Sequence, residues 1–263
     1  MGDRSACDRA ATAATLAPMT VVLRDGYDIG EQVAKDPLVQ VIDDFVTPGE
    51  CKHIINQARS KMKRGRVTLD DEVAFSEGRT GSTAWLGHDS TPVVKKLVSR
   101  VGELVGIPTH HAESLQIVHY AEDQEYKPHH DAWKVGTERH ANRTENGGQR
   151  LVTALMYLNE VEAGGGTGFP KLKLEVAPIQ GRMVIFHNTT GMVNDVHKKS
   201  LHGGMPVLLG EKWACNLWFR ERAYERPGSR KGINSKVMAQ RAGGRPSPKK
   251  NRKNQKAARR RNR

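Results

Sequence analysis

The chain of 263 residues has few cysteines, few aromatic residues and no long apolar segment. Its three cysteines, Cys7, Cys51 and Cys215, are scattered and lack metal-ligand spacing, which argues against a disulfide framework and a cysteine-based metal site. No segment approaches the ~18 consecutive apolar residues that a membrane-spanning helix requires. These absences predict no transmembrane segment. They favour an intracellular soluble protein, cytoplasmic or nuclear, with the endoplasmic reticulum or another organelle as the alternative.

Acidic residues are absent from one end of the chain. The formal net charge is +13 at pH 7, and residues 226–263 hold 15 of the 42 Lys and Arg residues but no Asp or Glu. A segment this basic and without apolar periodicity cannot bury enough surface to fold alone, so we expect a disordered basic tail. Three interpretations stay open: a solubilising tail, a nuclear localisation signal, or a segment that binds nucleic acid or an acidic protein.

The other end of the chain is also predicted to lie outside the folded domain. Residues 1–30 are expected to form a flexible N-terminal extension, because the start is rich in Ala and Thr and Pro18 interrupts its one apolar run. A cleaved targeting peptide is the alternative. Residues 31–225 then remain as one domain, which is long enough to bury a full core.

Periodicity in this domain changes from helical to extended. Thr47, Pro48 and Glu50 are typical of a helix start, and Thr91-Pro92 opens a second helix with an apolar stripe. The apolar runs of strand length are residues 38–45, 115–120, 150–159, 181–187 and 213–219. Residues 67–86 are polar and contain glycine, as in a surface loop or a flap over a substrate. The pattern predicts an α+β fold with supporting N-terminal helices and a sandwich or jelly-roll β part.

His129-His130-Asp131 is the stretch most indicative of chemistry. In an extended strand His129 and Asp131 project from the same face, so they can offer an imidazole and a carboxylate to one ion. His202 is the candidate third ligand, completing the two-His, one-carboxylate triad typical of non-haem Fe(II) oxygenases. His130 competes with His129 but should point to the opposite face. Because a His-x-Asp triplet arises by chance about 0.5 times in such a chain, its surroundings must decide.

Five motifs in order extend this pattern along the chain. They are Tyr126 to Asp131 (YKPHHD), Met156 to Asn159 (MYLN), Gly165 to Pro170 (GGTGFP), Ser200 to Gly204 (SLHGG) and Gly210 to Trp213 (GEKW). Together they resemble the catalytic domain of prolyl 4-hydroxylases, which are Fe(II)- and 2-oxoglutarate-dependent dioxygenases, over residues 37–221. The resemblance implies a double-stranded β-helix (jelly-roll) core. It also implies hydroxylation of peptidyl proline at C4, with 2-oxoglutarate decarboxylated to succinate and CO2, and therefore Fe(II), 2-oxoglutarate, O2 and ascorbate.

The resemblance assigns the iron and the co-substrate to named residues. His129, Asp131 and His202 match the catalytic iron ligands. Lys212, ten residues after His202, matches the lysine that binds the far carboxylate of 2-oxoglutarate. Strand alternation places Lys212 on one face of its strand together with Ala214, Asn216 and Trp218.

Three further residues are expected near the co-substrate. Tyr157 and Tyr120 match tyrosines that lie close to 2-oxoglutarate in the family, although either could be an ordinary half-buried aromatic residue. Thr153 shares the strand parity of Tyr157 and is therefore expected beside the same ligand.

The substrate side is predicted from Arg150, Arg79 and Trp133. Arg150 matches an arginine near the substrate proline, but in a regular strand it would face away from Tyr157, so that role requires a bulge or a strand start. Arg79 opens an Arg-Thr-Gly-Ser segment that resembles the family's Arg-Thr-Ser segment, with Gly81 a departure. Trp133 occupies a position that is aromatic in the family and either lines the peptide groove or packs in the core.

Three functions remain open from sequence alone. The leading one is a prolyl 4-hydroxylase acting on a proline-containing peptide or protein. The second is a 2-oxoglutarate oxygenase acting on a nucleic acid or small molecule, but demethylases of the AlkB type use paired arginines where this chain has Lys212 and Trp218. The third is a non-catalytic metal-binding β-helix module, which would have no need for Lys212.

Overall fold

The computed structural model describes residues 21–64, 67–69, 72–74, 78–190 and 194–224. The chain divides into a unit Met1–Arg226 and a unit Pro227–Arg263. The predicted basic tail and residues 1–20 of the predicted extension lie outside the described residues, and so does Cys7.

An eight-stranded sheet, the main sheet, forms the larger part of the fold. Its strands run antiparallel to their neighbours. In spatial order they are β1 (Glu31–Lys35), β2 (Leu38–Ile42), β13 (Met183–His187), β9 (Arg150–Tyr157), β18 (Lys212–Arg220), β7 (Leu115–Tyr120), β6 (Ser82–Leu86) and β3 (Lys63–Arg64). The central strands β13, β9 and β18 are almost entirely buried, as their continuous apolar runs predict.

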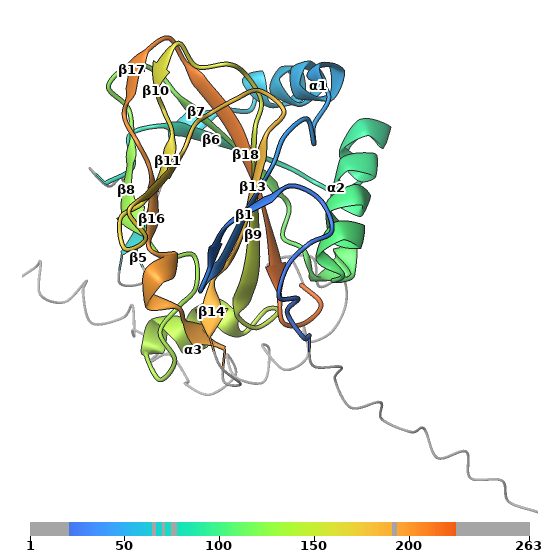
Figure 1. The fold of residues 1–263 in the computed structure, drawn as a ribbon, viewed down its shortest axis with the longest axis vertical. Coiled ribbons are helices and arrows are strands. Elements are labelled where there is room, and N and C mark those ends of the chain that lie inside the picture. The colour runs from blue at the N-terminus through green and yellow to red at the C-terminus, as the bar shows by residue number, and fades with distance from the viewer. Residues whose placement is uncertain (1–20, 65–66, 70–71, 75–77, 191–193, 225–263) are drawn as a thin grey trace, which may run out of the picture. The chain divides into compact units, whose positions relative to one another are not determined.

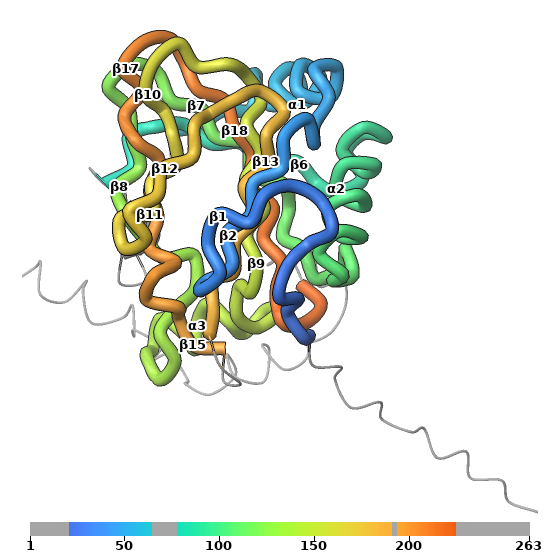
Figure 2. Tube along the Cα trace, in the orientation of Figure 1, coloured from blue at the N-terminus to red at the C-terminus, as the bar shows by residue number. Residues whose placement is uncertain are grey.

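A four-stranded sheet, the small sheet, faces the main sheet and closes the jelly roll (Figure 1). Its order is β12 (Leu174–Val176), β11 (Thr167–Phe169), β16 (His202–Gly204) and β8 (Tyr126–His129). Two-stranded ribbons complete the described strands: β10 (Ala163–Gly164) with β17 (Val207–Leu209), β14 (Thr189–Thr190) with β15 (Asp195–Val196), and β4 (Val67–Leu69) with β5 (Glu72–Ala74). The tube in Figure 2 shows the small sheet at the left and the main sheet at the centre.

Two helices cover the side of the main sheet that faces away from the small sheet (Figure 1). Helix α1 (Pro48–Arg59) begins with a capping box, in which the Thr47 side chain accepts from the Glu50 amide and the Glu50 carboxylate accepts from the Thr47 amide. Helix α2 (Pro92–Val105) is capped by Thr91 and ends at Gly106 with a φ of 73°. Both begin where the sequence predicts. None of the described helices is long and apolar enough to cross a membrane.

Two apolar clusters hold these layers together. The first lies between the helices and the main sheet and includes Ile54, Leu97 and Ile117. The second lies between the two sheets and includes Phe169 and Phe186, whose rings meet edge to face at 5.1 Å. The α+β fold with a double-stranded β-helix core and supporting helices is therefore confirmed.

Two predicted features need correction. Residues 21–30 fall within the predicted flexible extension, but the Tyr27 side chain is buried and its hydroxyl lies 3.1 Å from His187 Nε2. The folded part therefore begins before residue 31. In the predicted loop or flap over residues 67–86, the last part is strand β6, which pairs with β7 in the main sheet from Ser82 to Leu86, whereas residues 70–71 and 75–77 lie outside the described residues.

The remaining helical segments are short and lie between the larger elements. They are α3 (Glu138–Thr144) and the 3-10 turns η1 (Thr109–His111) and η2 (Lys198–Ser200). Of these, α3 follows the His129-His130-Asp131 stretch and precedes β9, so it is connected at both ends to strands of the site described below.

Candidate active site

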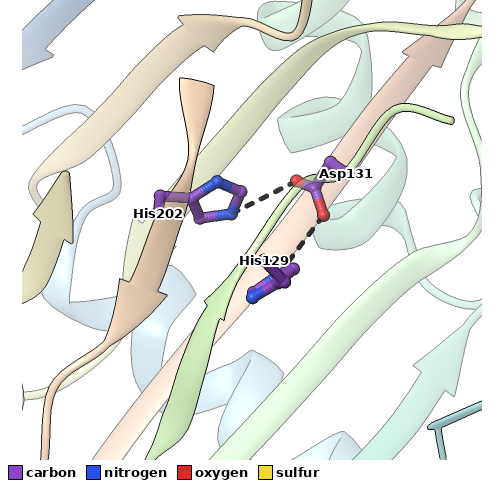
Figure 3. A group of neighbouring side chains, drawn as sticks. All are labelled: His129, Asp131 and His202. Carbon is purple, nitrogen blue, oxygen red and sulfur yellow. Dashed lines mark ion pairs between the residues drawn. The ribbon is translucent and has the colours of Figure 1, made fainter. Parts of the chain in front are cut away.

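His129, Asp131 and His202 meet between the two sheets (Figure 3). His129 ends β8 and His202 begins β16, and the two residues are direct partners in the strand pairing. His129 Nε2 lies 3.6 Å from Asp131 Oδ1, and His202 Nε2 lies 3.5 Å from Asp131 Oδ2. One potential ligand atom from each residue lies within 4.8 Å of the others, so the three can bind a single metal ion.

The backbone explains how two histidines from separate strands come so close. A Cβ atom on Gly203 would lie 2.8 Å from the Tyr126 carbonyl oxygen and 3.0 Å from the Pro128 nitrogen. A side chain at position 203 would therefore push β16 away from β8. The predicted Ser-Leu-His-Gly-Gly motif thus contains both a ligand and the glycine that lets its strand approach the other ligand's strand.

Hydrogen bonds from both rings favour coordination through Nε2. His129 Nδ1 lies 3.0 Å from the Lys127 carbonyl oxygen, and His202 Nδ1 lies 2.9 Å from the Ser200 carbonyl oxygen. A carbonyl only accepts, so each Nδ1 carries the proton and each Nε2 keeps a free lone pair toward Asp131. Burial lowers the pKa of His202 to about 4, which keeps this ring neutral at pH 7.

Asp131 is buried and held by donors from the main sheet. Burial would by itself raise the pKa of this carboxyl, but attraction by His202, His129 and Arg150 holds it far below the usual range. Thr153 Oγ1 and Trp218 Nε1 each donate to Asp131 Oδ2 at 2.8 Å. The carboxylate is therefore ionised and fixed in orientation, as a metal ligand requires.

His130, the competing ligand, also lines the cavity but makes a different contact. Its Nδ1 lies 3.3 Å from Ser200 Oγ, and it is not part of the metal-binding cluster among the described residues. The strand alternation that favoured His129 over His130 in the sequence agrees with this arrangement.

Lys212 is a buried cation in the same cavity. It is 2% exposed, and its Nζ donates to the Gly166 carbonyl oxygen at 3.4 Å. The Nζ also lies 5.3 Å from the Tyr157 ring centre and 5.8 Å from that of Tyr120. Burial lowers the pKa of Lys212 to about 7. Among the described residues no carboxylate forms an ion pair with it, and a buried unpaired ammonium is costly unless an anion binds there.

A cavity of about 260 Å³ connects this lysine to the metal-binding cluster. The four residues that alternate along β18, Lys212, Ala214, Asn216 and Trp218, all line it. A 2-oxo acid that chelates a metal at one end needs a cation for its far carboxylate. The metal-binding cluster and Lys212 supply both in one cavity, so the residues fit Fe(II) and 2-oxoglutarate.

Arg150 lines the cavity because the pairing of β9 and β18 is irregular. The register of this strand pairing shifts between Phe219 and Arg220, and the shift lets the Arg150 side chain face the cavity. The Arg150 guanidinium binds both carboxylate oxygens of Glu113, at 2.6 and 2.8 Å, and lies 3.8 Å from the Trp218 ring centre. Glu113 is not predictable from the sequence, since a single carboxylate before a strand carries no pattern.

Trp133 and Arg79 also line the cavity. The guanidinium of Arg150 lies 5.1 Å from the Trp133 ring centre. Arg79 is buried, its Nη2 donates to Gln116 Oε1 at 3.2 Å, and its guanidinium lies 4.7 Å from the Tyr126 ring centre. The three predicted substrate residues thus line the same cavity as the metal-binding cluster.

Of the residues predicted near the co-substrate, Tyr120 lines the cavity, whereas Thr153 and Tyr157 lie behind its lining. The Thr153 hydroxyl contacts Asp131, and it accepts from Asn188 Nδ2 at 2.8 Å. The Tyr157 hydroxyl lies 2.6 Å from Thr167 Oγ1. Thr153 therefore orients a metal ligand, and Tyr157 supports Thr167, which does line the cavity.

This fold and site define the chain as a 2-oxoglutarate- and Fe(II)-dependent oxygenase, an oxidoreductase. The family model of the 2OG-Fe(II) oxygenase superfamily matches residues 115–220, from β7 to β18. Prolyl 4-hydroxylase 5 of Arabidopsis thaliana is 32% identical over 219 residues, which cover 74% of this chain and 72% of that protein. Prolyl 4-hydroxylase 1 of the same plant is 32% identical, with 77% and 75% covered. The chain belongs to the prolyl 4-hydroxylase family.

A solved structure agrees with this assignment. The crystal structure of viral collagen prolyl hydroxylase from Paramecium bursaria Chlorella virus-1, in complex with 2OG, has a TM-score of 0.56 and 27% identity. The match covers 69% of this chain and 95% of the viral one. A Pseudomonas putida prolyl-4-hydroxylase, with a TM-score of 0.51 and 17% identity, supports the fold alone; the match covers 69% of this chain and 92% of the bacterial one.

Proposed function

We propose that this chain hydroxylates C4 of a proline within a peptide or protein and converts 2-oxoglutarate to succinate and CO2. The observation that carries the proposal is Lys212, which is buried, forms no ion pair with the described residues and lies in the same cavity as His129, Asp131 and His202. When bound, Fe(II) and 2-oxoglutarate supply the oxidising chemistry with O2. Ascorbate, as the reductant that keeps the iron ferrous, is part of the same proposal.

The chain's own residues bind and orient the reactants. His129, Asp131 and His202 hold the metal, with Thr153 and Trp218 fixing the Asp131 carboxylate. Lys212 binds the far carboxylate of 2-oxoglutarate and, with Thr167 and Tyr120 beside it on the cavity wall, fixes its position. Such positioning supplies much of the rate, because each reactant is held next to the other before reaction.

The aromatic side chains suit a proline ring. Trp218, Trp133 and Tyr126 line the cavity, and Arg150 and Arg79 lie against them. We propose that the proline ring packs among these rings and that the arginines donate to peptide carbonyls. An extended or polyproline II peptide loses little conformational entropy on binding, which makes it a suitable substrate.

An intracellular site of action belongs to the same proposal. Cys51 and Cys215, the two cysteines in the described part of the chain, are free thiols. Free thiols in a folded domain are typical of a reducing compartment. A role of the basic tail with nucleic acid or an acidic partner is likewise proposed from its composition alone.

The test combines two products from one reaction. Protein loaded anaerobically with Fe(II) is mixed with 2-oxoglutarate, O2 and a proline-rich peptide, and both succinate and peptide mass are measured. We expect the peptide to stimulate succinate formation and to gain one oxygen atom on proline, whereas a peptide with alanine in place of proline should do neither. Succinate without peptide oxidation would redirect the substrate to a nucleic acid or small molecule. No succinate from metal-loaded protein would contradict the enzyme assignment.

A further inference from the structure

Asn188 is a fully buried polar side chain that lies outside the cavity lining. It is the single residue between β13 and β14, and it is 0% exposed. Asparagine is costly to bury, because its side-chain amide carries two hydrogens to donate and an oxygen to satisfy. Buried polar groups are accordingly hydrogen-bonded, so the partner of this amide shows what the residue does.

The local backbone does not explain why asparagine stands at this position. Asparagine often serves where φ is positive, but Asn188 is not among the described residues with a positive φ. Its side-chain amide caps no turn either. Among the described residues it makes one hydrogen bond, from Nδ2 to Thr153 Oγ1 at 2.8 Å, and its Oδ1 has no partner there. The contact with Thr153 is therefore the polar contact that the Asn188 side chain contributes to this part of the structure.

The direction of this hydrogen bond is fixed by Asp131. Thr153 has a single hydroxyl hydrogen, and the ionised carboxylate of Asp131 can only accept. The hydroxyl therefore donates to Asp131 Oδ2, at 2.8 Å, and its oxygen accepts from Asn188 Nδ2. Asn188, Thr153 and Asp131 thus form a chain in which each group donates toward the metal-binding cluster. Hydrogen bonds in such a chain strengthen one another.

Asn188 supplies what the position of Thr153 alone cannot. A hydroxyl hydrogen rotates about the C–O bond, so a short contact with Asp131 does not by itself keep the hydrogen on the carboxylate. The amide hydrogen of Asn188 occupies the Thr153 oxygen from the other side and excludes rotation of the hydroxyl hydrogen toward Asn188. The donating orientation toward Asp131 is thereby favoured before a metal ion binds.

Backbone contacts hold position 188 whatever its side chain. The Asn188 amide donates to the Leu151 carbonyl oxygen at 2.8 Å, and the Asn188 carbonyl oxygen accepts from the His197 amide at 2.9 Å. A side-chain substitution leaves both hydrogen bonds in place. The contribution of the amide group can therefore be tested with little displacement of the strands that carry the site.

We propose that Asn188 is a positioning residue of the metal centre. Its amide holds the Thr153 hydroxyl in the orientation that donates to Asp131, and this raises the affinity of the site for a divalent metal ion. The inference rests on the metal site of the proposed function, but it does not depend on the identity of the substrate. Asn188 acts only through Thr153, since its side chain makes no hydrogen bond to a metal ligand among the described residues.

The experiment measures metal affinity without turnover. Metal-free, full-length protein is titrated with Co(II), which accepts the same ligand types and gives a visible spectrum that depends on its coordination. We expect Asn188→Leu, which keeps the branched shape and removes the amide, to weaken Co(II) binding by roughly three- to tenfold. This loss is smaller than that expected for a direct partner of a ligand, because Asn188 acts one bond further away. Asn188→Ala, which cannot overpack the site, should weaken binding to the same extent.

A double-variant cycle separates positioning from a general disturbance of the fold. In Thr153→Val there is no hydroxyl to orient, so adding Asn188→Leu should change Co(II) affinity by less than about twofold. The Co(II) spectrum of Asn188→Leu should also shift toward that of Thr153→Val.

Gln40 provides the matched control. It is another buried side-chain amide of the main sheet, but it binds the backbone of Tyr27, at 2.8 and 3.1 Å. Gln40→Leu should lower the free energy of unfolding and leave Co(II) affinity unchanged, because it removes buried hydrogen bonds that do not reach the metal site.

The outcomes distinguish this inference from the proposed function. Unchanged Co(II) affinity in both Asn188 variants would overturn it, and so would losses from Asn188→Leu and Thr153→Val that multiply in the double variant. An equal loss of affinity in Gln40→Leu would also overturn it, because disturbance of the fold would then be the cause. All three results would leave proline hydroxylation untouched. Absence of Co(II) binding in the parent protein would overturn the metal site, and the proposed function with it.

Discussion

The small sheet and the main sheet divide the candidate site between them. The small sheet provides two metal-binding histidines, His129 from β8 and His202 from β16, and it brings them together by close backbone approach at Gly203. The main sheet carries the groups that we propose bind or orient the organic reactants, among them Lys212 from β18 and Arg150 from β9. We therefore expect metal binding to depend chiefly on the small sheet and co-substrate binding chiefly on the main sheet, although Thr167 of β11 also lines the cavity.

The two sheets also differ in how they are supported. The main sheet packs against α1 and α2 through the larger apolar cluster, so its inward-facing charges stand on a rigid base. The small sheet has short strands and places glycine at positions 168, 203 and 204. From this difference we expect iron affinity to depend on backbone proximity and co-substrate affinity to depend on a charge held by a packed sheet. We expect single substitutions to change iron affinity without changing 2-oxoglutarate affinity, or the reverse.

The largest effect is expected for Asp131, which lies between the sheets. Asp131→Ala should lower iron affinity and turnover by at least about a hundredfold, because it removes the anionic ligand and leaves the Thr153 and Trp218 donors without an acceptor. Metal content and succinate formation measure the two effects. The exposed Asp89→Ala is the control and should retain both. Full iron content in Asp131→Ala would contradict the assigned ligand set.

Lys212 provides the sharpest separation of the two sheets. Lys212→Met should raise the KM for 2-oxoglutarate by about a hundredfold or more while leaving iron binding unchanged, because the substitution removes the charge and keeps the volume. The ligand-free variant should also be more stable to denaturant than the parent protein, since the substitution removes a buried ammonium that forms no ion pair with the described residues. The exposed Lys127→Ala serves as control. Loss of iron in Lys212→Met would break the division between the sheets.

Thr153 tests where that division ends, because it stands on the main sheet but contacts a metal ligand. Thr153→Val should weaken iron binding by about ten- to a hundredfold, the usual range for a group that orients a ligand. Thr153→Ser keeps the hydroxyl and should restore most of the affinity. Metal titration measures both. If Thr153→Val instead changes only the KM for 2-oxoglutarate, the residue acts on the co-substrate, as its strand parity predicted.

Regular patterns made much of this architecture predictable. The start of α1 follows from Thr47, Pro48 and Glu50, since capping is local chemistry, and β7 has the bounds that its apolar run predicts. The His-x-Asp spacing and the glycines after His202 placed the metal-binding cluster. Strand parity also predicted that the Thr153 side chain points into the space between the two sheets. Strand parity did not show that the Thr153 hydroxyl would bind Asp131. Parity tells which face of the sheet a side chain occupies, but not which residue on the opposite sheet it contacts.

The features that escaped prediction depend on contacts between distant residues. Glu113 meets Arg150 across 37 positions, and Asn188 meets Thr153 across 35, with no periodic signal at either site. The inward turn of Arg150 depends on a register shift opposite Arg220, which only the pairing of β9 and β18 reveals. Tyr27 reaches the core through Gln40 and His187, so the start of the folded part is set by tertiary contacts.

The smallest predicted effect is the pH dependence of 2-oxoglutarate binding, which we expect to arise from Lys212 of the main sheet. Because burial lowers the pKa of Lys212 to about 7, the ligand-free enzyme loses this charge as pH rises through neutrality. The 2-oxoglutarate dianion binds the protonated form and raises the pKa of Lys212, so binding should take up a proton. The affinity of the enzyme for 2-oxoglutarate should therefore fall as pH rises above about 7, by up to about tenfold per pH unit.

The stability of the ligand-free protein should change in the opposite direction. A lysine in the unfolded chain has its ordinary pKa of 10.5, so between about 7 and 10.5 the unfolded state binds more protons and the free energy of unfolding rises with pH. Calorimetric titration of 2-oxoglutarate into Zn(II)-loaded protein, in buffers of different ionisation enthalpy, measures the proton uptake directly. Lys212→Met should abolish it. Proton uptake that persists in this variant would show that another group in the cavity takes up the proton. Lys212 would then be charged already before 2-oxoglutarate binds.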